Sequence, residues 1–155
     1  MEEYIELKIP GNPKMLCLVR QNVNLACRMV GFDERQVNGI TLAVDEGCTN
    51  IIRHCYGGDT KGVIVVRLRL YADRIVIVLR DFGEGMDSKK LEKCLAKRQL
   101  CKVSKKAVRP GGLGVMLIHT VMDRVQYKTS PDFGTVLKLT KYLSDSREAR
   151  GGSSD

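Results

Sequence analysis

The spacing of two β-rich segments constrains the fold of this chain more than any other feature. Residues 63–71 and 74–80 are both rich in valine, isoleucine and leucine, and only Ala72 and Asp73 separate them. A connection this short joins antiparallel strands, because a parallel pair needs a crossover of about a dozen residues or more. The two segments therefore predict an antiparallel hairpin and argue against an alternating parallel fold.

The segments around this hairpin predict one further strand, several helices and a second strand pair. Residues 4–9 alternate between apolar and polar, as in a half-buried strand. Two amphipathic helices, with capping residues Asn12 and Asp33, follow before the hairpin. After it we expect a glycine-rich loop, two helices and two strands, over residues 81–85, 88–96, 111–122, 124–129 and 134–142.

This order of elements predicts an α+β fold: a two-layer α/β sandwich with a mixed, mostly antiparallel sheet and helices on one face. A length of 155 residues suits one domain, which we place at residues 1–143, with residues 144–155 as a flexible tail. The N-terminus lacks an apolar signal core, and the longest apolar run is about half of a membrane helix. We therefore expect a cytoplasmic protein without a membrane segment.

The six cysteines allow a second test of the expected compartment. None of them is spaced as C-x-x-C, and most fall in predicted helices. Free thiols in a reducing compartment are the simplest interpretation. A metal site built from Cys48, His54 and Cys55 is the alternative.

The net charge of +8 comes from one stretch of the chain. Residues 89–109 hold nine of the 26 basic residues and one of the 18 acidic ones, so 17 of each sign remain elsewhere. Such a stretch attracts an anion, which could be a nucleic acid, a polyphosphate or an acidic protein. It contains no aromatic residue that could stack on bases, which weighs against single-stranded nucleic acid.

Two polar residues of the second predicted helix form the first candidate site. Glu46 and Asn50 lie one turn apart on its polar side, while Val44 and Ile51 lie on the opposite side. A carboxylate and a carboxamide so placed can hold a hard cation, and the carboxylate can accept a proton from an attacking hydroxyl. A solvated helix face is the alternative.

Two glycine-rich stretches form the second candidate site. Asp81 ends a predicted strand and precedes Gly83 and Gly85, so its carboxylate could accept a hydrogen bond from an exocyclic amine of a flat ligand. Residues 111–114 open a helix whose free N–H groups suit phosphate. An ordinary turn and a flexible hinge are the respective alternatives.

Four stretches taken in this order resemble a known family. They are LAVDEGCTNIIRHCY at 42–56, DFGEGMD at 81–87, RPGGLGVMLI at 109–118 and GT at 134–135. Together they resemble the GHKL ATP-binding fold and, within it, the anti-sigma factor serine/threonine kinases of bacterial partner-switching systems. The resemblance extends over nearly the whole chain.

The resemblance implies a role for each matching residue. Glu46 is expected to be the catalytic general base, and Asn50 the magnesium ligand that bridges the metal to the triphosphate. Asp81 is expected to read adenine, supported by Thr135 through a bound water, and the basic stretch at about 87–111 is expected to be the ATP lid. Further nucleotide contacts are expected at Gly83, Gly85, Arg109, Gly111, Gly112, Leu113 and Gly114.

The resemblance also implies an activity. It implies an ATP- and Mg²⁺-dependent kinase that phosphorylates a small STAS-type antagonist and sequesters a sigma factor, as a homodimer without direct nucleic-acid contact. Three alternatives stay open: a non-kinase ATP-binding regulatory module of the same fold, the detached ATP-binding domain of a histidine kinase, and direct nucleic-acid binding through the basic stretch.

Overall fold

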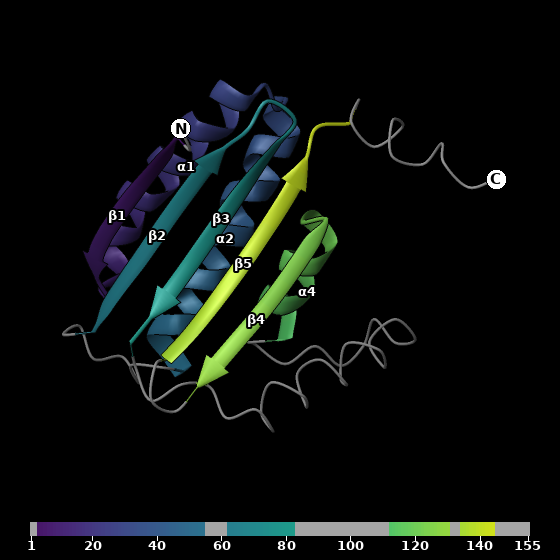
Figure 1. The fold of residues 1–155 in the computed structure, drawn as a ribbon. Coiled ribbons are helices and arrows are strands. Elements are labelled where there is room, and N and C mark those ends of the chain that lie inside the picture. Colours follow the sequence, from purple (N-terminus) through teal and green to yellow (C-terminus); the bar gives the residue numbers. More distant parts are fainter. Residues whose placement is uncertain (1–2, 55–61, 83–111, 131–133, 145–155) are drawn as a thin grey trace, which may run out of the picture.

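An open sheet of five strands, with helices on one face, forms the described part of the chain in this computed structural model (Figure 1). The structure describes residues 3–54, 62–82, 112–130 and 134–144. Its elements are β1 (Tyr4–Pro10), a 3₁₀ turn (Pro13–Met15), α1 (Leu16–Val30), α2 (Glu34–His54), β2 (Val63–Leu70), β3 (Arg74–Asp81), α4 (Gly112–Val121), β4 (Arg124–Ser130) and β5 (Gly134–Tyr142).

The strand order is β1-β2-β3-β5-β4, and every neighbouring pair among these strands is antiparallel. Both predicted strand pairs and the two-layer fold class are therefore confirmed. The parallel component of the expected mixed sheet is absent from the described strands. The predicted helix at 88–96 and the tail after residue 144 lie outside the described residues. None of the helices in the described part is both long and apolar enough to cross a lipid bilayer.

Local chemistry explains where the 3₁₀ turn begins, where α1 ends and where α2 begins. The side chain of Asn12 accepts a hydrogen bond from the backbone N–H of Lys14 at 3.0 Å. Gly31 ends α1 with a φ of 105°, a left-handed conformation that glycine adopts without strain. Before α2, Asp33 and Gln36 exchange backbone-to-side-chain hydrogen bonds of 2.8 and 3.2 Å, which form a capping box.

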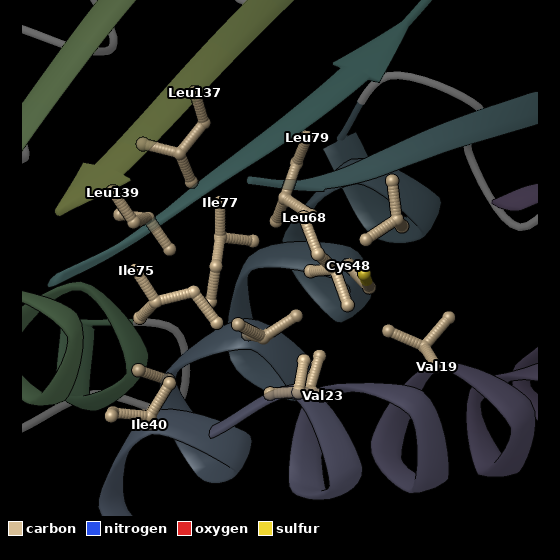
Figure 2. Packing of buried hydrophobic residues seen from close by; sticks show 14 of the residues in the cluster. Val19, Val23, Ile40, Cys48, Leu68, Ile75, Ile77, Leu79, Leu137 and Leu139 are labelled. Atoms are coloured by element: carbon tan, nitrogen blue, oxygen red, sulfur yellow. The ribbon is translucent and has the colours of Figure 1, made fainter. Parts of the chain in front are cut away.

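The hydrophobic core lies between the helices and one face of the sheet. Alternate residues of each strand point toward the helices, and the apolar sides of α1 and α2 meet them (Figure 2). The side chains labelled there come from α1, α2, β2, β3 and β5: Val19, Val23, Ile40, Cys48, Leu68, Ile75, Ile77, Leu79, Leu137 and Leu139. This core fixes α2 across the middle of the sheet.

Gly47 allows α2 to lie close to β3 and β5. A Cβ atom at this position would lie 2.6 Å from Leu79 Cδ1 and 3.3 Å from Leu137 Cδ2. Any larger residue must therefore push the helix or these leucines out of place.

Glycines also bring α2 and α4 together as antiparallel neighbours. Early in α2, a Cβ atom at Gly39 would lie 3.4 Å from Val121 Cγ1, near the end of α4. Seven residues later, Glu46 meets Gly114 near the start of α4. Because seven residues return a helix to the same face, one side of α2 provides both contacts.

Two Gly→Ala substitutions in α2 test how closely this helix must pack. Gly47→Ala overfills the core, which we expect to cost about 1–3 kcal/mol. Gly39→Ala is the matched control: it gains the same helix propensity but makes only an ordinary contact. Urea unfolding should show the Gly47→Ala protein to be less stable than the Gly39→Ala protein. Equal stability of the two would contradict the close packing on β3 and β5.

Candidate functional site

The described segments that hold predicted site residues meet at one end of the sheet. The end of β3, the start of β5, the last turns of α2 and the first turn of α4 lie together there in Figure 1. The contacts of Gly47 with Leu79 and Leu137 are consistent with this arrangement, since these leucines lie two residues from Asp81 and Thr135. Residues far apart in the sequence therefore share this end of the molecule.

Asp81 is fully buried at the end of β3, on the helix-covered side of the sheet. Its Oδ1 accepts a hydrogen bond from the backbone N–H of Thr135 at 3.3 Å. The Thr135 hydroxyl is 3.1 Å from the Thr129 hydroxyl on β4. A buried carboxylate is costly unless it is hydrogen-bonded, so the start of β5 helps to hold this acid in place.

Gly134 is required where β5 passes Asp81. Its φ is +78°, and a Cβ atom there would collide with the backbone carbonyl of Asp81 and lie 3.0 Å from Oδ1. Both the conformation and the space demand glycine. In the sequence the Gly134-Thr135 pair is a weak signal, because a turn would explain it equally well.

Glu46 lies against the beginning of α4. Its side chain is half-buried, and its carboxylate occupies the space that a Cβ atom at Gly114 would need. The first N–H groups of a helix have no partner within the helix, and this end favours negative charge. The close approach to Gly114 therefore places a carboxylate beside the positive end of α4.

Asn50 continues the same side of α2 one turn further on, and it is also half-buried. Val44 and Ile51, predicted on the opposite side, are both buried in the core. The polar side of α2 is therefore the side that carries Glu46 and Asn50.

Several predicted site residues lie outside the described residues. These are Gly83, Gly85, Arg109 and Gly111, together with the lid expected at about 87–111. Gly112 and Leu113 are the first two residues of α4, followed directly by Gly114.

Two features of this region were not predicted from the sequence. Arg20 of α1 forms an ion pair with Asp45 of α2 at 2.6 Å. Asp45 directly precedes Glu46 in the sequence. Thr129 joins the site because β4 pairs it with Thr135. Neither has a spacing signal, since the first pair is 25 residues apart and the second depends on strand register.

Cys48 lies between Glu46 and Asn50 in sequence but points into the core (Figure 2). Burial, with a smaller contribution from Asp45, raises the pKa of its thiol to about 12. A neutral buried thiol is a poor nucleophile near pH 7. Within the described ranges no three His, Cys, Asp or Glu side chains could together hold a metal ion. The alternative Cys48–His54–Cys55 site is not tested here, because Cys55 and the side chain of His54 lie outside those ranges.

The chain is similar to proteins of one family. The sequence model of the histidine kinase-like ATPase domain matches residues 9–141. A serine-protein kinase RsbW from Bacillus velezensis is 30% identical over 149 residues, which cover 96% of this chain and 91% of that protein. A serine-protein kinase RsbW from Halalkalibacterium halodurans is 33% identical, with coverage of 91% and 84%. The resemblance seen in the sequence motifs is thus confirmed.

A solved structure supports the fold. The crystal structure of the RsbU and RsbW domains of Rv1364c from Mycobacterium tuberculosis matches 90% of this chain with a TM-score of 0.61 and 16% identity. This chain spans 32% of the length of that longer chain. At this identity, the match concerns the fold alone.

Proposed function

This chain belongs to the histidine kinase-like ATPase domain family, and from this membership we propose that it is a serine-protein kinase that uses ATP. The observation that carries the proposal is the position of Glu46, whose carboxylate lies against Gly114 at the start of α4. A kinase of this kind needs a base near the end of the triphosphate, and a helix N-terminus is where phosphate binds. The family membership and this contact support the same site.

We assign the chemical step to Glu46 as general base. Its carboxylate would accept the proton of the acceptor serine or threonine hydroxyl as that oxygen attacks the terminal phosphorus of ATP. The bond from this phosphorus to the ADP oxygen breaks, and ADP leaves. A half-buried carboxylate beside a helix N-terminus can act in this way because it remains within reach of a bound protein substrate.

The nucleotide would be held by residues on both sides of Glu46. Asn50 and Glu46 offer oxygen atoms, the ligands that magnesium prefers, and the metal when bound would neutralise charge on the triphosphate. Asp81 would accept a hydrogen bond from the exocyclic amine of adenine, with Thr135 beside it. The N–H groups of residues 112–114 would meet phosphate. The contributions of Gly83, Gly85, Arg109 and Gly111 belong to the same proposal.

The partners of the kinase are part of the same proposal, which the family membership supports. We propose that the chain phosphorylates a small STAS-type antagonist, sequesters a sigma factor and acts as a homodimer in the cytoplasm. Direct contact with nucleic acid is not part of this function. A non-kinase regulatory module that binds ATP is the competing account, and the next experiment separates the two.

Replacing Glu46 by alanine should abolish transfer and leave ATP binding intact. Because a general base contributes about 10²- to 10⁴-fold, we expect a loss of at least about 100-fold in labelling of the antagonist from γ-³²P-ATP. Calorimetry should give a similar affinity for ATP. Glu34→Ala, which removes an exposed glutamate from the start of the same helix, is the control and should phosphorylate normally. Wild-type rates in the Glu46→Ala protein would refute the base assignment. Tight ATP binding without any transfer by the wild-type protein would favour the regulatory module.

Gly114→Ala tests the contact that positions the base. The added methyl group must displace the Glu46 carboxylate, which is the free end of a flexible side chain, so the fold should tolerate it. Misplacing a catalytic group by about 1 Å can cost about 100-fold in rate. We expect a loss of that order in phosphorylation without a lower melting temperature, whereas Gly39→Ala should retain activity.

The combined substitution shows whether Gly114 acts through Glu46. If it does, Gly114→Ala should cause little further loss in a Glu46→Ala background. Independent, multiplicative losses would mean that Gly114 affects transfer by another route.

A further inference from the structure

The second face of the sheet carries a pattern that the kinase site does not use. In Figure 1 the helices lie behind the strands, so the viewer looks onto a face that no described helix covers (Figure 1). Residues paired directly across antiparallel strands lie on the same face, and the registers therefore identify every side chain that points this way.

This open face is strongly basic. Among the described strand residues that point to it, one carboxylate, Glu6, stands among eight cations. The cations are Lys8, Arg67, Arg69, Arg74, Arg80, Arg124, Lys128 and Lys138. Outside the 89–109 stretch the sequence is balanced in charge, so folding has separated the signs and gathered cations on this face.

Apolar side chains alternate with these cations in the middle of the face. One row across all five strands reads Lys8, Val65, Arg80, Val136 and Lys128. In the neighbouring rows Val78 lies between Arg67 and Lys138, and Val76 lies beside Arg69. The face therefore has aliphatic groups on its inner strands and lysines at both edges.

Aromatic rings hold several of these arginines in place. The guanidinium carbon of Arg67 lies 5.1 Å from the centre of the Tyr4 ring. Arg80 lies 4.7 Å from the Phe82 ring, and Arg124 lies 5.9 Å from the Tyr142 ring. Stacking of this kind reduces the freedom that an arginine loses when it binds a carboxylate.

We propose that this open face is a docking surface for an acidic protein segment that presents carboxylates and aliphatic side chains on the same side. Charge complementarity carries the proposal. Five of the eight cations are exposed, and the one acid, Glu6, is already ion-paired with Arg67. The exposed cations are Lys8, Arg80, Arg124, Lys128 and Lys138. An apolar centre with a polar rim and enriched arginine is also the composition of protein interfaces.

Two other occupants fit the face less well. Single-stranded nucleic acid needs aromatic rings on which bases stack, but the inner rows carry valines while the rings lie under arginines. A second copy stacked face to face would bring two basic surfaces together, which costs energy through like-charge repulsion.

The proposal of an acidic partner on this face goes beyond the proposed kinase activity and does not depend on it.

Binding of a labelled peptide with a repeating Glu-Ser-Val-Ser sequence tests the proposal, because residues two apart lie on the same side of an extended chain and glutamate and valine then face the sheet together. Fluorescence anisotropy should show it to bind more tightly than a peptide of equal charge with serine in place of valine, and more tightly than an oligothymidylate of equal charge. Amide shifts in ¹⁵N spectra should concentrate at Val65, Val78 and Val136. The affinity should fall as salt is raised, because exposed charges are screened.

Matched charge-neutralising variants locate the binding. Arg80→Gln with Lys138→Gln should weaken the glutamate–valine peptide about 2- to 30-fold, as expected for two exposed ion pairs. Lys14→Gln with Arg35→Gln removes two exposed cations outside this sheet face and should leave the affinity unchanged. Both proteins should melt at the wild-type temperature.

Three results would overturn the proposal. The first is equal weakening by the two variant pairs, which would indicate non-specific attraction or binding to the 89–109 stretch. The second is tighter binding of oligothymidylate at this face. The third is loss of self-association in the Arg80→Gln, Lys138→Gln protein during sedimentation, which would assign the face to a second copy of the chain.

Discussion

Close contact between α2 and its neighbours is the constraint on which the rest of the structure depends. Gly47 lets the helix lie against Leu79 and Leu137, and Gly114 lets α4 approach until its backbone meets Glu46. Because Gly47 and Gly114 have no side chains, α2 packs closely into the core on one side and against the N-terminus of α4 on another. The same packing that builds the core therefore places a carboxylate beside a helix N-terminus, where we propose that phosphate is bound.

The two faces of the sheet differ in composition: one is covered by helices and mostly apolar, and the other is open and basic. On the covered face the apolar rows end at Asp81 and Thr135, which lie two residues beyond the leucines that pack against Gly47 of α2. On the open face the alternate residues are cations and valines, which no described helix covers. Because side chains alternate along each strand, one set of strands supplies both the end where we propose nucleotide binding and a separate basic surface.

Local patterns in the sequence predicted most of the fold but only part of the site. The capping box at Asp33 and the short hairpin connection act over a few residues, so they can be recognised without the fold. The spacing of Glu46 and Asn50 likewise follows from helix geometry. The contacts of Glu46 with Gly114 and of Arg20 with Asp45 join distant segments, and no local pattern encodes them. The basic face was not predicted for the same reason. The total charge outside residues 89–109 is balanced, and only the strand register places the cations on one face.

The central claim is that the end of β3 and the start of β5 bind the base of ATP. A comparison of ATP with GTP tests this claim most directly. Calorimetry should give the wild-type protein a clear preference for ATP. Asp81→Asn keeps an oxygen that can accept the Thr135 N–H but loses the carboxylate, and we expect it to bind ATP at least about tenfold more weakly and to lose the preference. An unchanged ratio of ATP to GTP affinity in this variant would contradict the account.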